Sequence, residues 1–270
     1  MNNEAMQREI KNGERLQKRL AAAGVASRRK AEELIRDGRA KVDNVIITEM
    51  GYIVSPKAEI KVDNVVINKE LKKYYCMNKP RSVISSVSDD KGRKTIIDII
   101  PDKLKTERLF PVGRLDYDTK GIILITNDGE FMNALVGPKS GIQKEYLVRV
   151  EGVIKKEELI PFEKGLTIKG QKYLPALTLI ESVDYKNKSS LVRIIITEGK
   201  YHQVKEMFAA INHPVKLMNR IRFGNITIEG LKEGEIRSLT PHEVKVLIEL
   251  SKHDKVLKSV KNEIKNCRKY

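Results

Sequence analysis

The densest group of reactive side chains lies in FPVGRLDYDTKGIILITNDGEF, residues 110–131. Asp116 and Asp118 are two residues apart, and Arg114 precedes Asp116 by two, so an extended segment would present all three on one face. The apolar run that follows predicts a strand, and loops held by strands are where reactive groups concentrate. A carboxylate there can act as a nucleophile or transfer a proton, although an aspartate in such a loop is more often a turn former or an ion-pair partner.

A metal-dependent reaction is the other chemistry open to Asp116 and Asp118. The four histidines stand in no helix-face or zinc-type spacing with a carboxylate, and Cys76 and Cys267 lie far apart. We therefore expect no metal site. A magnesium-dependent nuclease built on the two aspartates remains an alternative.

The composition favours a nucleic-acid partner. The 270 residues carry 52 Lys and Arg against 36 Asp and Glu, a formal net charge of +16 that favours a polyanion. No apolar run reaches the roughly 20 residues needed to cross a bilayer, tryptophan is absent, and no long basic amphipathic helix is present. Two distant cysteines fit a reducing compartment. We expect a cytoplasmic protein that does not bind membranes.

Two domains and two tails are predicted from the length and from composition shifts. Residues 1–14 are polar and aperiodic, and residues 251–270 carry a net charge of +5, so both are expected to be tails. Residues 15–70 then form a small first domain. After a polar stretch, residues 73–250 form a larger second domain.

Two short helices followed by short strands are predicted for the first domain. The apolar residues of 16–23 recur at helical spacing, and Ser27 is placed to cap a second helix that ends at Gly38. The β-branched runs 41–48 and 60–67 are each broken by an Asp-Asn pair. These pairs favour turns because Asp and Asn tolerate positive φ.

The start of the second helix is a predicted phosphate-binding surface. Residues 15–41 hold nine Lys or Arg and three acids, and Arg28, Arg29 and Lys30 begin the helix. The helix dipole and free N–H groups favour an anion there, whereas three cations cost helix stability when no anion is bound. The plainer alternative is an ordinary charged helix surface.

An α+β fold around a mixed sheet is predicted for the second domain, because strands dominate and helices do not alternate strictly with them. The expected strands are 74–77, 122–126, 145–150, 177–183, 191–197 and 225–228. The expected helices are 130–136, 156–163, 201–211 and 241–250.

The first domain resembles a known RNA-binding module. The string GVASRRKAEELIRDGRAKV, residues 24–42, is similar to the small RNA-binding domain first known in a protein of the small ribosomal subunit. The resemblance implies docking onto structured RNA, although Asp43-Asn44 stands where Asn-Gly is usual. The implied contact residues are Arg15, Lys18, Ser27, Arg28, Arg29, Lys30 and Lys41.

The second domain resembles a family of RNA-modifying enzymes. GRLDYDTKGIILITND, residues 113–128, is similar to the catalytic signature of the RsuA/RluB family of ribosomal-RNA pseudouridine synthases. NKP at 78–80, KEYLVRV at 144–150 and TEGKYHQVKEMF at 197–208 follow the family's order. Each motif alone is weak, and their combination is specific. The resemblance implies a cofactor-free isomerase that converts a uridine of ribosomal RNA, or of a ribosome assembly intermediate, to pseudouridine, and we expect a monomer.

The resemblance also implies roles for individual residues. Asp116 would be the catalytic carboxylate, and Tyr146 would stack on the uracil and take the carbon 5 proton. Lys200 would pair with Asp116, and Arg114 would fill the space left by the flipped base or contact phosphate. The plainer roles are a core aromatic for Tyr146 and an ion pair with Asp116 or Asp118 for Arg114.

The helix predicted over 201–211 has an apolar and a polar side. Its apolar stripe at i, i+3, i+4 and i+7 consists of Val204, Met207, Phe208 and Ile211. On the polar side Gln203 and Lys205 are candidate RNA contacts. Glu206 stands where relatives usually have a basic residue, as Ser82 stands where they favour glycine.

The RNA target is open at the level of the ribosomal subunit. SVSDDKGRKTIIDII, residues 86–100, looks more like relatives acting on large-subunit RNA, which we favour, whereas KYHQVK, residues 200–205, looks more like small-subunit relatives. A non-catalytic RNA-binding ribosome assembly factor is the alternative from another class. That alternative would not require Asp116, Tyr146 and Lys200 together.

Overall fold

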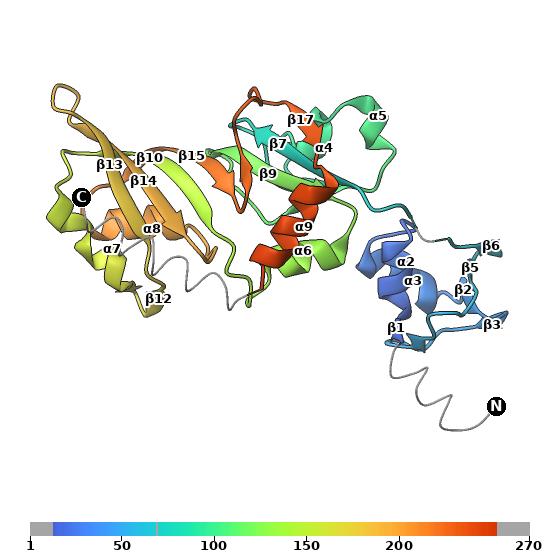
Figure 1. Ribbon diagram of the computed structural model, residues 1–270. Coiled ribbons are helices and arrows are strands. Elements are labelled where there is room, and N and C mark those ends of the chain that lie inside the picture. Colours follow the sequence, from blue (N-terminus) through green and yellow to red (C-terminus); the bar gives the residue numbers. More distant parts are fainter. Residues whose placement is uncertain (1–12, 69, 253–270) are drawn as a thin grey trace. The chain divides into compact units, whose positions relative to one another are not determined.

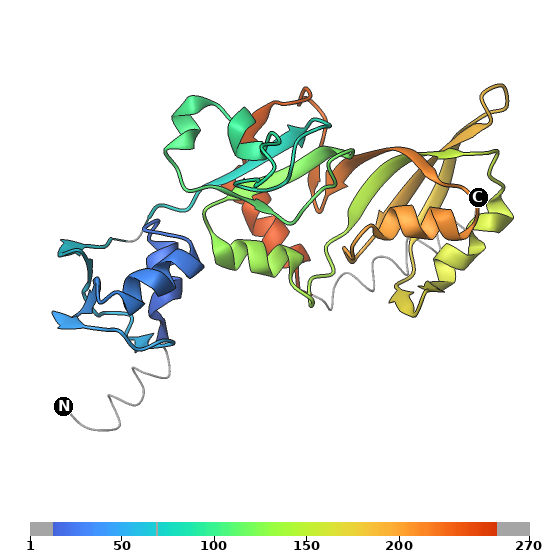
Figure 2. The same ribbon diagram turned by 180° about the vertical axis from the view of Figure 1, so that it is seen from behind.

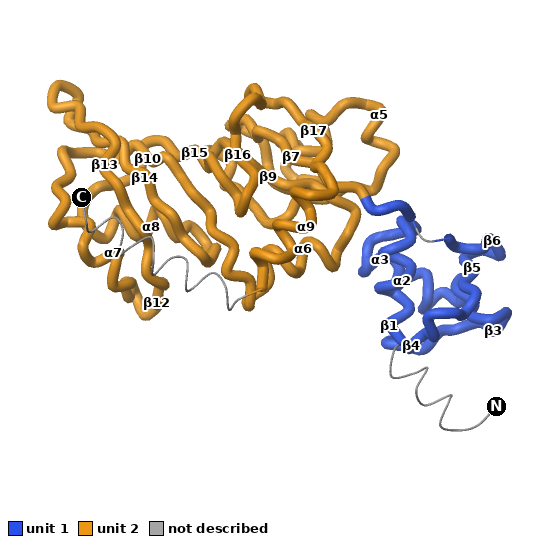
Figure 3. The backbone as a smooth tube through the Cα atoms, viewed as in Figure 1, with its two compact units in different colours: residues 1–72 blue, residues 73–270 orange. Residues whose placement is uncertain are grey.

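The chain folds into two compact units, residues 1–72 and 73–270 (Figures 1 and 3). The computed structural model describes residues 13–68 and 70–252, so the two predicted tails fall almost entirely outside the described residues. Each unit has its own apolar core. Within the described ranges, no helix is long and apolar enough to span a membrane.

Two helices pack against each other in the first unit, α2 (Leu16–Ala22) and α3 (Arg28–Arg36). Their apolar sides are almost fully buried in the core of the unit. The Ser27 hydroxyl accepts a hydrogen bond from the Lys30 N–H at 3.1 Å, so the predicted helix cap is confirmed.

Two β-hairpins complete this unit, and both turn at an Asp-Asn pair. Asp43, Asn44, Asp63 and Asn64 have φ angles of 47, 68, 50 and 66°, the positive values at both central positions that a type I′ turn requires. The predicted turns are therefore confirmed. The hairpin strands form a sheet in the order β3-β2-β5-β6, and β1 pairs with β4. These strands are β1 (Glu14–Arg15), β2 (Ala40–Val42), β3 (Val45–Ile46), β4 (Ile53–Val54), β5 (Ile60–Val62) and β6 (Val65–Val66).

A mixed sheet forms the second unit, in the order β13-β14-β10-β15-β9-β7-β17. The pair β15–β9 is parallel, and the other pairs along this path are antiparallel. The predicted α+β class is confirmed. The strands are β7 (Tyr74–Lys79), β8 (Phe110–Val112), β9 (Lys120–Thr126), β10 (Lys144–Glu151), β11 (Leu166–Ile168), β12 (Gln171–Tyr173), β13 (Leu177–Asp184), β14 (Ser189–Ile196), β15 (Val215–Phe223), β16 (Ile226–Thr227) and β17 (Ile236–Ser238).

Helices cover the sheet in two places (Figures 1 and 2). On the side of β13, β14, β10 and β15, α7 and α8 bury their apolar residues against one face. At the other end, α6 and α9 pack together against β7 and β9. The helices are α4 (Ile96–Ile99), α5 (Asp102–Lys105), α6 (Gly129–Val136), α7 (Ile160–Lys164), α8 (Gln203–Ala210) and α9 (Pro241–Leu250), with a short 3₁₀ turn at Lys156–Leu159.

The pattern-based predictions find the longer elements of the second unit except β15, and they also miss the short elements β8, β11, β12, β17, α4 and α5. Each predicted strand and helix of the second unit overlaps an observed one, and α9 has the predicted bounds. The β15 sequence VKLMNRIRF contains three cations and an asparagine, and its buried residues are Met218, Arg220 and Phe223. Because a charged residue occupies a buried position, the alternation of apolar and polar residues that marks a strand is lost.

Candidate active site

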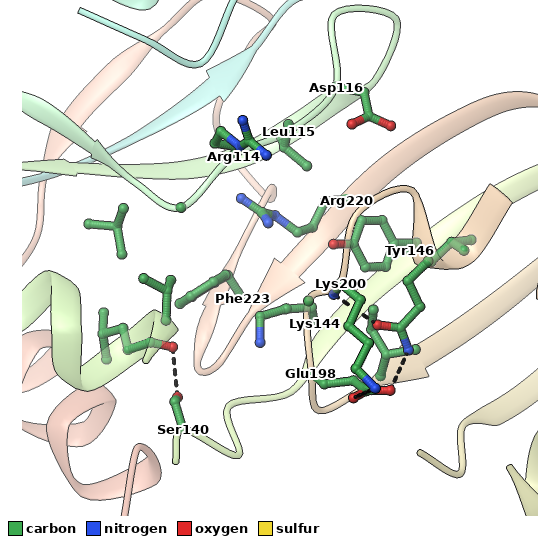
Figure 4. Close-up of a pocket in the computed structure, with 18 of the residues that line it drawn as sticks. Arg114, Leu115, Asp116, Ser140, Lys144, Tyr146, Glu198, Lys200, Arg220 and Phe223 are labelled. Atoms are coloured by element: carbon green, nitrogen blue, oxygen red, sulfur yellow. Dashed lines mark hydrogen bonds and ion pairs between the residues drawn. The ribbon is translucent and has the colours of Figure 1, made fainter. Parts of the chain in front are cut away.

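A cavity of about 390 Å³ lies between the loop at residues 113–116, the sheet and the start of α8 (Figure 4). Lys144 and Tyr146 of β10 and Arg220 of β15 line its sheet side. The cavity brings together residues that are as much as 89 positions apart and that the sequence predicted, namely Arg114, Asp116, Tyr146, Lys200 and Gln203.

The loop that carries Asp116 is held from the preceding segment. The Ser85 hydroxyl accepts a hydrogen bond from the Leu115 N–H at 3.0 Å and donates one to the Leu115 carbonyl at 2.9 Å. The Ser82 N–H donates to the Tyr117 carbonyl at 2.8 Å. Ser82 has a φ of 59°, which glycine adopts without strain, and this accounts for the glycine usual at the position.

Lys79, the lysine of the NKP motif, holds the same loop from below. Its side chain is fully buried, and its ammonium donates hydrogen bonds to the carbonyls of Pro80 at 2.9 Å, Thr119 at 2.8 Å and Asp116 at 3.3 Å. Burial, together with the nearby positive charge of Arg220, lowers the pKa of Lys79 to about 8. The motif was noted in the sequence, but the role of its lysine was not predicted.

Asp116 forms an ion pair with Lys205 of α8. The Lys205 Nζ lies 3.0 Å from one carboxylate oxygen, and the other oxygen lies 3.6 Å from the His202 Nε2. Lys205 also contacts Asp118, at 2.8 Å. The Asp116 side chain is 27% exposed, so it is reachable from the cavity while one side of the carboxylate is held by the lysine.

Lys205 and Asp118 shift each other's pKa. Partial burial lowers the pKa of Lys205, but hydrogen bonds and attraction to Asp118 and Asp116 outweigh this, so the pKa is raised above its usual value. Burial raises the pKa of Asp118, but the hydrogen bond from Lys205 and the attraction to its charge, with smaller contributions from the backbone and His202, together outweigh burial, so that pKa is lowered. Lys205 is therefore a permanent cation beside Asp116 at neutral pH.

The predicted pairing of Lys200 with Asp116 is wrong. The Lys200 ammonium lies 3.2 Å from the Glu198 carboxylate, donates to the Lys172 carbonyl and sits 5.4 Å from the centre of the Tyr173 ring. The reason is the irregular segment before α8, which ends at His202 with a left-handed φ of 50°. Because of this turn, Lys200 lies against β12, and Lys205 in the first turn of α8 lies next to Asp116 instead.

Tyr146 occupies the position that alternation along β10 predicts. Tyr146, Val148 and Val150 are buried on one face, whereas Leu147 is half-buried on the other. Tyr146 is directly opposite Ile194 of β14 and Arg220 of β15. One side of its ring therefore packs in the sheet while the residue lines the cavity.

Arg114 and Gln203 both line the cavity, but Arg114 is exposed and Gln203 is buried. Arg114 is exposed, and among the described residues it forms no ion pair with Asp116 or Asp118, so its guanidinium is free to bind a phosphate. Gln203 is only 3% exposed. Its side chain accepts a hydrogen bond from the Lys200 N–H and donates one to Glu198. Gln203 therefore forms part of the cavity wall and does not lie on an exposed polar side of the helix.

The structure adds residues that the sequence reasoning missed, because each lies at a buried position normally given to an apolar side chain. Lys144 is 6% exposed and Arg220 3% exposed, and both line the cavity. The signal for Lys144 was its place at the start of KEYLVRV. Arg220 had no signal, since β15 was not predicted.

The predicted RNA contacts of the first unit stand in different environments. Arg28 and Arg29 are exposed at the start of α3 and form no ion pair with any described residue. Lys30 pairs with Glu33 at 2.6 Å, Lys18 with Glu14 at 3.5 Å, and Lys41 donates to Asn64 at 2.8 Å. Arg15 and Ser27 are also exposed, with the Ser27 hydroxyl occupied as the helix cap. Arg15, Arg28 and Arg29 are thus the predicted contact cations most available for phosphate.

Comparison with known proteins decides the family. A family model described as RNA pseudouridylate synthase matches residues 73–210, more than half of the chain. The chain belongs to the RNA pseudouridine synthase family. An S4-domain model matches residues 14–60, the helices and first hairpin of the first unit. The enzyme is therefore an isomerase that acts on RNA.

Within residues 13–68 and 70–252, no group of three or more His, Cys, Asp or Glu is placed to hold a metal ion.

Relatives match over most of their length. The enzyme is 45% identical over 242 residues to ribosomal large subunit pseudouridine synthase B of Bacillus subtilis (strain 168), covering 90% of this chain and 98% of the relative. It is 38% identical over 232 residues to an uncharacterized RNA pseudouridine synthase of Aquifex aeolicus (strain VF5), covering 85% and 92%. A crystal structure of a pseudouridylate synthase matches with a TM-score of 0.61 and 30% identity, covering 86% of this chain and 99% of that one. The predicted family and fold are confirmed.

The buried Lys79 makes the stability of the enzyme depend on pH. Its pKa of about 8 in the folded state lies below the value of about 10.4 in an unfolded chain, so the unfolded state binds more protons between these values. The contribution of Lys79 to the free energy of unfolding therefore rises with pH in this window. From pH 7.5 to 9.5 we expect wild type to gain about 1–2 kcal/mol relative to Lys79→Met in urea unfolding.

The comparison with the variant removes the effect of other groups. The Cys76 thiol, whose pKa burial raises to about 11, acts in the opposite direction above pH 9 in both proteins. A difference in unfolding free energy that stays constant over this range would contradict the assignment of a titrating Lys79.

Proposed function

We propose that this enzyme converts a specific uridine of large-subunit ribosomal RNA to pseudouridine, with Asp116 as the catalytic carboxylate. The observation that carries the proposal is the position of Asp116, which is paired with Lys205 at 3.0 Å and lines the same cavity as Tyr146. The Bacillus subtilis relative, whose name specifies the large ribosomal subunit, supports the choice of RNA.

The reaction needs only groups that the cavity supplies. The bond between uracil N1 and ribose C1′ breaks, the base turns, and C5 bonds to C1′, so nothing is oxidised and no outside group enters. Asp116 attacks the sugar or the base or assists proton removal, and Lys205 compensates its charge. Tyr146 stacks on the uracil and is placed to take the C5 proton.

The uridine must leave its stack before it reaches Asp116. Flipping a base out of folded RNA costs a few kcal/mol, and contacts to the displaced strand offset this cost. Arg114, exposed at the cavity and without an ion pair among the described residues, is suited to bind a phosphate or fill the vacated space. Arg28 and Arg29 of the first unit supply further phosphate contacts.

Release of tritium from RNA labelled at uracil C5 tests the chemistry directly. We expect release from large-subunit RNA or an assembly intermediate and none from small-subunit RNA. Mapping pseudouridines in ribosomal RNA from cells with and without the protein then identifies the site. A small-subunit target would be seen as release from the other RNA, and an assembly factor would bind RNA and release no tritium from either.

The proposed phosphate contacts of α3 predict a salt-dependent loss of affinity. For Arg28→Ala/Arg29→Ala we expect about tenfold weaker RNA binding and a salt slope smaller by about 1–2, with the single-turnover rate at saturating enzyme unchanged. Fluorescence anisotropy at several salt concentrations measures the slope. Lys155→Ala/Lys156→Ala is the matched control, since it removes two adjacent exposed lysines at the start of a 3₁₀ turn in the second unit. Equal effects of both double variants would argue against a specific role for α3.

A further inference from the structure

Two buried cations stand side by side on the cavity floor. Lys144 of β10 and Arg220 of β15 are 6% and 3% exposed, on neighbouring strands in which Tyr146 is directly opposite Arg220 and Lys144 opposite Phe223. Both line the cavity next to Tyr146 (Figure 4). A base stacked on Tyr146 would therefore lie in the cavity that these two cations line.

Neither cation has its charge compensated within the described part of the chain. The Arg220 Nε donates to the Ile122 carbonyl at 2.7 Å, but one of its terminal nitrogens is buried and has no hydrogen-bond partner. The Lys144 ammonium donates to the Ile142 carbonyl at 2.9 Å. Neither forms an ion pair, and the Glu198 carboxylate is engaged by Lys200 and Gln203.

An uncompensated pair of buried cations is costly to the folded protein. Each loses most of its hydration, and the two positive charges repel each other. Burial and then the charge of Arg220 lower the pKa of Lys144 to about 8. The Phe223 ring gives only partial relief, at 5.1 Å from the Arg220 guanidinium and 5.7 Å from the Lys144 ammonium. A ligand that brings negative charge would remove this cost.

We propose that Arg220 and Lys144 bind the carbonyl edge of the target uracil and stabilise the negative charge that collects on the base during the reaction. This proposal rests on the proposed function. A backbone phosphate is the other anion in RNA, but the adjoining walls, Val112, Leu135 and Phe223, are apolar and fully buried. A flat base fits such walls, whereas a tetrahedral phosphate would lose its hydration there.

The charge arises in either route open to Asp116. When the N1–C1′ bond breaks, its electron pair stays on the uracil, which becomes an anion with charge on O2 and O4. If the carboxylate adds to the ring instead, the electrons again move onto the carbonyl oxygens. The pair is returned when C5 bonds to C1′, the C5 proton leaves, and N1 gains a proton. Donors fixed beside O2 and O4 act most strongly in the transition state.

Single-turnover kinetics with saturating enzyme test the proposal. We expect Arg220→Gln to lower the rate of tritium release about 100-fold, Arg220→Lys to recover part of it, and RNA affinity to stay within about threefold. Arg222→Gln is the matched control, because Arg222 is on the same strand, half-buried and bound to Glu145 at 2.5 Å, but does not line the cavity. We expect it to leave the rate within about threefold of wild type.

The pH profile of the wild-type enzyme tests Lys144 without relying on a variant that folds poorly. The single-turnover rate of wild type should fall above pH 8 as Lys144 loses its proton, together with Lys79 beneath the Asp116 loop, whose pKa is also about 8. Lys144→Arg should fall less than wild type in this range, because only Lys79 then titrates. The charged groups that face Lys144 are Arg220 from β15 and Glu198 from the segment after β14, and a guanidinium keeps its charge throughout this range.

Two outcomes would overturn the proposal for Arg220 and Lys144, and a third would overturn the proposed function on which it rests. A wild-type rate for Arg220→Gln, with a flat profile to pH 10, would rule out charge stabilisation by this pair. Weaker RNA binding with a smaller salt slope, but an unchanged rate at saturation, would identify a phosphate site instead. Wild-type enzyme that releases no tritium from any ribosomal RNA would refute the proposed function itself.

Discussion

Asp116→Asn should eliminate tritium release, with a loss of at least about 10⁴-fold, while RNA affinity stays within about threefold of wild type. The amide keeps the size of the side chain but can neither attack a carbon atom nor accept a proton. The loop should keep its position, since Ser85 and Lys79 hold it through backbone atoms. Single-turnover tritium release and anisotropy binding measure the two quantities on the same RNA.

Asp118→Asn is the matched control. Asp118 also contacts Lys205, but its side chain is 67% exposed and it does not line the cavity. We expect a loss of no more than about tenfold, through the altered position of Lys205. Equal and severe losses for both variants, together with magnesium-dependent RNA cleavage that EDTA abolishes, would instead support a nuclease that uses both carboxylates.

Lys205→Met should lower the single-turnover rate about 10³-fold. The variant keeps the length of the side chain and its packing but removes the cation 3.0 Å from Asp116. The carboxylate then lacks a partner that holds its orientation and compensates its charge in a partly buried site. The measurement is tritium release at saturating enzyme, accompanied by a thermal unfolding curve to show that the variant folds.

Two comparisons separate this role from a contact with RNA phosphate. Lys205→Arg should recover much of the rate, because a guanidinium can also pair with Asp116. Lys200→Met should cost far less than Lys205→Met, since Lys200 pairs with Glu198. A Lys205→Met enzyme that loses affinity with a smaller salt slope, yet reacts at the normal rate once bound, would show that Lys205 serves the RNA backbone.

The partner of Asp116 illustrates the limit of motif matching. Lys200 and Lys205 lie in one motif, five residues apart, and both are basic, so sequence alone offers two candidates for one pairing. The choice depends on the turn at His202, whose left-handed conformation no residue pattern near it announces. The structure resolves the choice because Lys205 lies in the first turn of α8, at ion-pair distance from Asp116.

The sequence by itself determined the family, the two-domain organisation and the identity of Asp116 and Tyr146 as candidates, because these depend on local spacing. A helix cap such as Ser27, a turn such as Asp43-Asn44, and the two-residue alternation along β10 all act through near neighbours in the chain. Their signals are therefore present in short strings of residues.

Only the tertiary structure decided which cations surround the reacting groups. Arg220 reaches the cavity because β15 pairs with both β10 and β9, and Lys79 reaches the Asp116 loop because β7 pairs with β9. A prediction from hydrophobic patterning assigns charged residues to exposed positions, because an isolated charge is costly to bury. Carbonyl groups far away in the sequence accept their hydrogen bonds, from Ile122 for Arg220 and from Asp116 and Thr119 for Lys79. These contacts exist only once the sheet has formed.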